Sequence, residues 1–204
     1  MSTRVSVRVS ARSLAGALLI SASAIAPAAA NAQGRAAPPR IGFAVGGGAM
    51  YGTLHGSDFS GTRAAAGFDA TAGILLRRWQ LGVGYDRATH GREDTDGDFV
   101  VSNIFVEPRL SLASGTRRLT PYAAVRLGRA MAAYETVVGI TDKASGYMAG
   151  VGGGALWFIA SHVQADAAVQ YDRLSHDYGT GGYADAEKGG RASARFGVRL
   201  TSTR

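Results

Sequence analysis

The stretch Trp79–Asp86, WQLGVGYD, alternates between large apolar residues and polar or small ones. Successive side chains of an extended strand point to opposite faces, so Trp79, Leu81, Val83 and Tyr85 share one face. Gln80, two glycines and Asp86 share the other face. A helix would scatter the same residues around its circumference, and the stretch therefore predicts a β-strand with one apolar face.

The same period of two recurs along the chain from Ile41 onward. It predicts eight strands, at residues 41–53, 66–76, 79–89, 99–112, 120–134, 145–157, 162–174 and 191–201. Long polar connections, at residues 54–65, 90–98, 136–144 and 175–190, alternate with short ones. This asymmetry with an even strand count predicts an all-β fold, a single antiparallel up-and-down eight-stranded transmembrane β-barrel.

The polar face of the predicted strands is rich in glycine and carries sparse charges of both signs. The interior of an eight-stranded barrel is just wide enough for side chains to fill it, and unpaired buried charge is costly. We therefore expect arginines and carboxylates to pair inside the barrel as a structural network, made of Asp69, Asp86, Glu107, Arg109, Arg126, Asp166, Asp172, Arg195 and Arg199. With the faces reversed, the chain would be a soluble lipocalin-like barrel or a β-sandwich.

Aromatic residues on the apolar face fall near the two ends of the predicted strands. Rings that are partly polar prefer the membrane–water interface, so such positions predict two aromatic belts. The predicted interface aromatics are Phe43, Trp79 and Trp157 near the short connections, and Tyr51, Tyr85, Tyr147 and Tyr171 near the long ones.

Three residues break the alternation. Arg129 falls on the apolar face by parity, whereas Phe105 and Tyr134 fall on the polar face. A β-bulge near Gly128 would shift the register and correct the placement of Arg129.

The first residues of the chain differ in composition from the rest. Three arginines precede a short apolar run that ends in small residues, which is the pattern of a cleavable secretory signal peptide at residues 1–32. Residues 33–40 contain two prolines and are expected to form a short linker, and residues 41–204 are expected to form the barrel.

Composition excludes several classes of function. The chain has 204 residues and no cysteine, so it has neither disulfides nor thiolate sites for metals or catalysis. The net charge of +7 comes from scattered arginines, three of them in the signal peptide, and predicts no nucleic-acid partner. We expect no cofactor, no metal and no catalytic residues. Ser175 and His176 are adjacent, so a strand points them to opposite faces and prevents them from pairing.

The chain resembles the small eight-stranded outer-membrane β-barrels of the outer membrane protein A and outer membrane protein X type. The resemblance covers residues 41–201, with its cues in Trp79–Asp86, Thr120–Gly128 (TPYAAVRLG) and Gly146–Trp157 (GYMAGVGGGALW). It implies location in the outer membrane, contact with membrane lipid, assembly by the barrel-assembly machinery, periplasmic turns and surface-exposed loops of unknown partner. Such barrels usually end in an aromatic residue, whereas this chain ends Leu200–Arg204.

These features predict a non-catalytic outer-membrane barrel that serves envelope integrity or surface interaction. Two alternatives stay open: a lipid-modifying enzyme active at the membrane rim, and a soluble periplasmic barrel that binds an apolar ligand. A wide pore is not expected, because eight strands leave no open lumen.

Overall fold

The computed structural model describes residues 41–56, 59–92, 98–112, 118–135, 141–177 and 187–202, and the predicted signal peptide and linker lie outside these ranges. No helix in the described ranges has the length and hydropathy of a membrane span. The strands are β1 (Ile41–His55), β2 (Ala65–Leu76), β3 (Trp79–Gly91), β4 (Asp98–Ser111), β5 (Leu119–Glu135), β6 (Thr141–Phe158), β7 (Val163–Asp177) and β8 (Glu187–Thr201).

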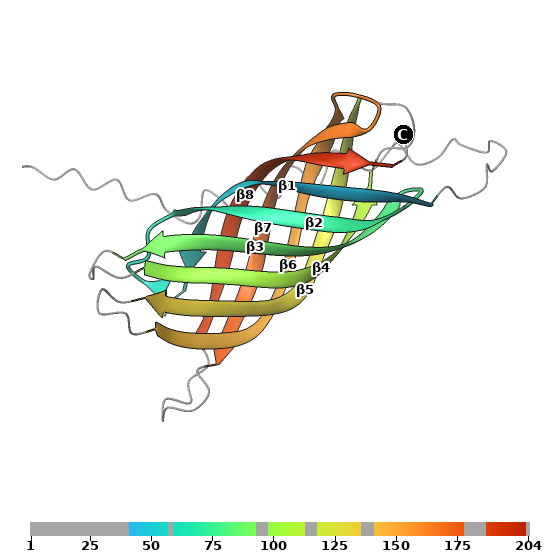
Figure 1. Ribbon diagram of the computed structural model, residues 1–204. Helices are drawn as coiled ribbons and strands as arrows, with labels where there is room; N and C mark the ends of the chain where they lie inside the picture. The colour runs from blue at the N-terminus through green and yellow to red at the C-terminus, as the bar shows by residue number, and fades with distance from the viewer. Residues whose placement is uncertain are drawn as a thin grey trace, which may run out of the picture. The chain divides into compact units, whose positions relative to one another are not determined.

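The eight strands form a closed barrel in chain order. Each strand pairs antiparallel with its neighbours in the sequence, and β1 pairs with β8 to close the sheet (Figure 1). Closure leaves no strand edge unpaired, which a lipid environment requires of any β-structure. The predicted fold class is confirmed.

The strand pairing sets the tilt of the barrel. Starting at Gly42 on β1, we move from each residue to its cross-strand partner on the next strand. This path passes through Gln80, Ala124 and Ser193 and returns to β1 at Gly52, ten residues further along the strand. A shear of ten with eight strands corresponds to a strand tilt of about 40°. At this tilt each residue along a strand adds about 2.5 Å of height along the barrel axis, and each step to the next strand adds about 3 Å.

The outer wall of the barrel is apolar and the interior is charged. Among the described residues, twenty-three large hydrophobic side chains are exposed, including Phe43, Val83, Leu127 and Phe196. By contrast, Asp86 and Arg191 are fully buried. A soluble barrel has the opposite arrangement, so the faces are assigned as the alternation predicts for a membrane barrel.

Two expectations about strand ends and register are wrong. Strands β6, β7 and β8 extend into the predicted long connections, because backbone pairing continues through polar residues such as Lys188, opposite Ser175, where no apolar alternation is needed. The pairing of β5 with β4 and β6 runs through Gly128 with constant register, so no bulge occurs there. Arg129 therefore lies on the outer wall, and Phe105 lies inside with 2% exposure. The side chain of Tyr134 lies outside the described part.

Candidate functional site

All nine side chains predicted for the interior network lie inside the barrel. Their residues come from β2, β3, β4, β5, β7 and β8, and eight of them are at most 9% exposed. The side chain of Arg195 is 8% exposed. Counted with Arg191, the described interior holds five carboxylates and five arginines, so its formal charge sums to zero.

The half of the network nearer the long connections is centred on Asp86 and Arg191. Arg191 of β8 donates to both carboxylate oxygens of Asp86 on β3, at 2.7 and 2.8 Å, and to Asp172 of β7 at 2.8 Å. Asp86 also accepts from the amide of Asn103 at 2.7 Å and from Arg126 at 3.2 Å. Such a two-pronged, charge-assisted contact is among the strongest polar contacts that proteins form, and here it joins opposite walls of the barrel.

Glu107 of β4 connects the middle of the network. Three arginines donate to its carboxylate: Arg109, Arg126 and Arg195, the last at 3.2 and 3.4 Å. The guanidinium of Arg126 also lies over the ring of Phe105, 4.0 Å from its centre. This cation–π contact explains why an aromatic ring occupies an otherwise polar layer.

Asp166 of β7 holds the part of the network nearer the short turns. It accepts from Arg109 at 2.8 Å and from the hydroxyl of Tyr122 at 2.6 Å. Arg195 donates to the Tyr122 oxygen at 3.2 Å, which links this part to Glu107. The contacts therefore form one continuous chain from Asp172 down to Asp166.

Two network residues are held more loosely. Asp69 has its ion pair with Arg195 at 3.7 Å. Arg199 is 2% exposed, yet none of its three guanidinium nitrogens has a hydrogen-bond partner among the described residues. Both residues line a small cavity together with Asp166 and Thr71. Waters are the ordinary partners of such buried polar groups.

Glycines on the inner face make room for these long side chains. A Cβ added at Gly150 would lie 2.1 Å from the Oδ1 of Asp172, and one added at Gly84 would lie 2.5 Å from the ring of Phe105. At these two positions glycine is therefore required by close packing of interior side chains, rather than by backbone conformation.

At the end that carries the long connections the interior is largely apolar, which the alternation of the strands did not predict. Phe59, from the connection between β1 and β2, is 3% exposed and packs 5.6 Å from the ring of Phe99 and 6.2 Å from that of His176. Beneath Phe59 lies a cluster that we call the apolar plug, formed with Leu54, Phe99, Val101, Phe105, Ala130, Ala132, Ala144, Met148 and Leu174. The plug lies inside the barrel on the side of the long connections and reaches the network at Phe105.

Sequence reasoning also missed several polar members of the network. Arg191, Asn103 and Tyr122 are each at most 3% exposed and bind network carboxylates. The parity of Arg191 with Arg195 on the same strand was a usable signal, because both positions face inward. Tyr122 offered no such signal, since an inward tyrosine in a polar layer is recognised only through its hydroxyl partner.

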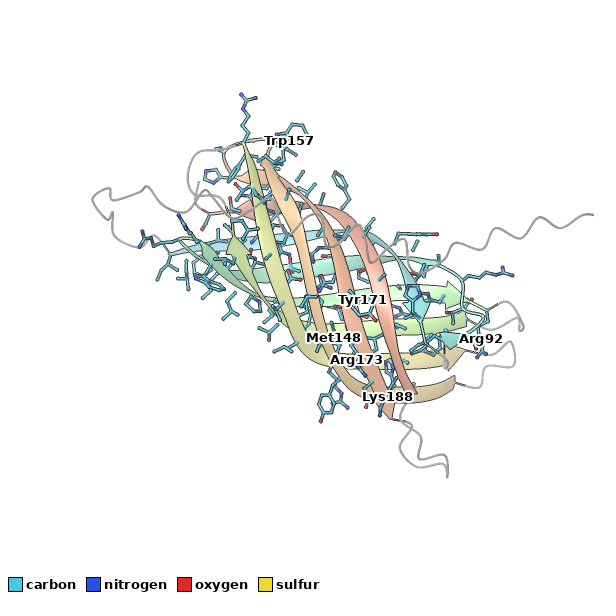
Figure 2. All side chains as sticks on the ribbon, turned by 180° about the vertical axis from the view of Figure 1, so that it is seen from behind. Arg92, Met148, Trp157, Tyr171, Arg173 and Lys188 are labelled. Atoms are coloured by element: carbon cyan, nitrogen blue, oxygen red, sulfur yellow. The ribbon has the colours of Figure 1, made fainter. Side chains whose placement is uncertain are left out.

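The predicted interface aromatics lie on the outer wall. Phe43, Trp79 and Trp157 are 55–64% exposed near the short turns, and Tyr51, Tyr147 and Tyr171 are 49–81% exposed near the other end. Tyr85 is partly covered, because its ring packs 5.9 Å from that of Phe68. Figure 2 shows Trp157 at the end of the barrel opposite Lys188, with Tyr171 between them.

The structure assembles no nucleophile from Ser175 and His176. Ser175 faces outward, whereas His176 is fully buried and neither of its ring nitrogens has a hydrogen-bond partner in the described part. Within the same part, no group of three or more histidine or acidic side chains is arranged to hold a metal ion.

Comparison with known proteins gives matches to solved structures. No family model matches the chain, and no curated protein matches its sequence. The crystal structure of Neisserial surface protein A is similar with a TM-score of 0.62 at 20% identity, over 78% of this chain and 96% of that one.

Two further structures share the fold. The attachment invasion locus protein Ail of Yersinia pestis, in complex with the heparin analogue sucrose octasulfate, matches with a TM-score of 0.51 at 14% identity, covering 80% of this chain and 98% of that one. Outer membrane protein AlkL, determined in lipid bilayers, matches with a TM-score of 0.51 at 13% identity, over 86% and 97% of the two chains. With its closed wall, apolar exterior and charged interior, this chain shares the fold of these small eight-stranded β-barrels of outer membranes.

Proposed function

We propose that this protein is a closed, non-catalytic scaffold of the outer membrane that anchors the connections at its extracellular end. The observation that carries the proposal is the filled interior, in which a neutral ion-pair network lies below the apolar plug. A barrel filled in this way holds its loops at the surface but offers no route for solutes. Envelope integrity and recognition of surface partners are the roles that such a scaffold serves.

The placement of the wall in lipid is supported by its own chemistry. Exposed apolar side chains such as Val83, Leu127 and Val151 occupy the middle of the wall, where transmembrane barrels carry their apolar band. The shared fold with AlkL, which was studied in lipid bilayers, supports the same placement. Insertion would then require the barrel-assembly machinery, as the resemblance implies.

Heat modifiability and carbonate extraction test the placement. We expect the protein to remain in the carbonate-resistant outer-membrane fraction and to migrate differently on a gel before and after boiling. Recovery from the soluble periplasm, without a mobility shift, would contradict the proposal and favour a soluble barrel with an apolar ligand.

Planar bilayer recordings test whether the barrel is closed. Because the network and the apolar plug fill the interior, we expect no large, stable conductance steps from the purified protein. Steps that persist after repurification would show that the interior opens.

A rim-located enzyme is the competing function, and the structure offers it little support. His176 is enclosed by the plug, where it contacts the ring of Phe59 and not Ser175. Altered lipid A in a deletion strain, restored by the parent protein but not by His176→Ala, would overturn the non-catalytic proposal.

A further inference from the structure

Three arginines project from the outer wall, where most side chains are apolar. Arg87 of β3, Arg129 of β5 and Arg173 of β7 are all exposed. No ion pair joins any of them to a carboxylate within the described ranges. A charged side chain on the lipid face of a barrel costs about 2–4 kcal/mol at the bilayer midplane and close to nothing at the interface. The height of these arginines relative to the bilayer midplane therefore determines the free-energy cost of exposing them on the outer wall.

The strand register places the three arginines at one height. Arg129 pairs with Tyr147 on β6, which pairs with Ser175 on β7, two residues beyond Arg173. Two strand steps raise the position by about 6 Å and two residues lower it by about 5 Å, so Arg173 lies within about 1.5 Å of the height of Arg129. The same construction through β4 places Arg87 equally close on the other side. We call these three residues the arginine tier.

The arginine tier lies immediately beyond the apolar band. The same heights place Phe43, Trp79 and Trp157 together in one belt, about 22 Å below the tier, close to the band height of roughly 25 Å expected for such barrels. Tyr51 and Tyr171 lie about 2–4 Å below the tier. Figure 2 shows the order on one wall, from Trp157 through Tyr171 and Arg173 to the far end.

The side chain of Arg129 is directed away from the apolar band. Its Nη2 donates to the Oγ of Ser145 at 3.0 Å, and Ser145 lies two residues nearer the extracellular end than Tyr147, the cross-strand partner of Arg129. Among the described outward-facing side chains, the acidic one is Asp98 on β4, and its height is about 12 Å above that of the tier. The tier is therefore purely basic at its own height.

We propose that the arginine tier binds the phosphate groups of the anionic lipids in the outer leaflet, a phosphorylated glycolipid of the lipid A type. Guanidinium groups match phosphate oxygens in geometry and charge, and they remain charged at any physiological pH. The inference rests on the outer-membrane placement proposed above. Arginines on alternate strands would bind several headgroups along one side of the barrel and fix its height in the bilayer.

The test compares two triple variants in zwitterionic micelles titrated with bis-phosphorylated lipid A. One variant is Arg87→Gln/Arg129→Gln/Arg173→Gln; the matched control, Arg77→Gln/Arg78→Gln/Arg118→Gln, removes the same charge from the turns at the opposite end, where all three residues are exposed. Binding is measured as the 3-hydroxy fatty acid of lipid A retained per protein after gel filtration, which reports the phosphorylated and the dephosphorylated lipid equally. Each basic group near an anionic surface contributes roughly a fivefold factor, so we expect about a 100-fold loss of affinity for the tier variant alone.

Several results would overturn the proposal. They are unchanged affinity of the tier variant, an equal loss in the turn variant, equal binding of dephosphorylated lipid A, or displacement of the lipid by millimolar inorganic phosphate. Each variant is first checked for heat modifiability, and the single variant Arg129→Gln replaces the triple if the triple does not fold. A parent protein that shows heat modifiability but binds no lipid A would refute the tier while leaving the membrane placement intact.

Discussion

Replacement of Arg191 by leucine tests the interior network most directly. Arg191 is fully buried and makes three hydrogen bonds to Asp86 and Asp172. The substitution leaves both carboxylates inside the barrel with fewer hydrogen bonds. Asp86 keeps Asn103 and a longer contact to Arg126, and Asp172 keeps the amide of Gln170 at 3.1 Å. Removal of one partner of a buried ion pair typically costs about 3–5 kcal/mol, and we expect a loss of about 3 kcal/mol in the free energy of unfolding.

The assay is urea unfolding in detergent micelles, with the folded fraction read from the unboiled band on a gel. Arg78→Leu serves as the control, because Arg78 is an exposed turn residue and its loss leaves no buried charge without a partner. The double variant Arg191→Leu/Asp86→Asn is expected to recover about 1–2 kcal/mol of the free energy of unfolding, since one of the two carboxylates left without Arg191 is then a neutral amide. A loss below about 1 kcal/mol for Arg191→Leu, or no recovery in the double variant, would refute the network as a source of stability.

Three further substitutions probe packing and closure. Gly150→Ala places a methyl group 2.1 Å from Asp172 and is expected to lower unfolding free energy by about 1–3 kcal/mol in the same assay. Tyr122→Phe removes the 2.6 Å hydrogen bond to Asp166 and is expected to cost about 1–2 kcal/mol, measured likewise. Phe59→Ala removes the top of the apolar plug, so we expect faster proteolysis of the connection after β1, followed by mass spectrometry.

Each of these expectations has a contradicting result. Gly153→Ala is the control for Gly150, because a Cβ at Gly153 approaches only a backbone oxygen at 3.1 Å. Equal effects of the two alanines would show that inner close packing is unimportant. A Tyr122→Phe variant as stable as the parent would assign the hydroxyl no role, and unchanged cleavage of Phe59→Ala would show that this ring does not fasten the connection.

The alternation of the sequence was sufficient to predict the wall, because period two is a local property of each strand. Residues such as Val83 and Asp86 were assigned to the correct faces without any knowledge of their neighbours. The partners within the interior were not predictable in this way. The Asp86–Arg191 pair joins residues 105 positions apart, and only the register around the closed sheet brings them together.

The apolar plug eluded prediction for a different reason. The polar residues at inward-facing positions, such as Glu107 and Arg109, predicted a charged interior along the whole barrel. On the same strand, however, the inward-facing positions of Phe99, Val101 and Phe105 carry apolar side chains. Phe59 lies outside any strand, so no periodicity marks it as part of the interior. Its placement depends on the connection folding back over the mouth, where it packs on Phe99.

The origin of the interior arginines along the chain has a consequence for biogenesis. Arg191, Arg195 and Arg199 all belong to β8, whereas β8 supplies none of the five carboxylates of the described interior. Until β8 docks, the nascent cavity has two cations against five anions and must remain hydrated. The pairing of β8 with β1 would therefore coincide with neutralisation of the interior charge and expulsion of water. Closure of this seam would then be a single concerted step, and a partly closed barrel would not be stable in the bilayer.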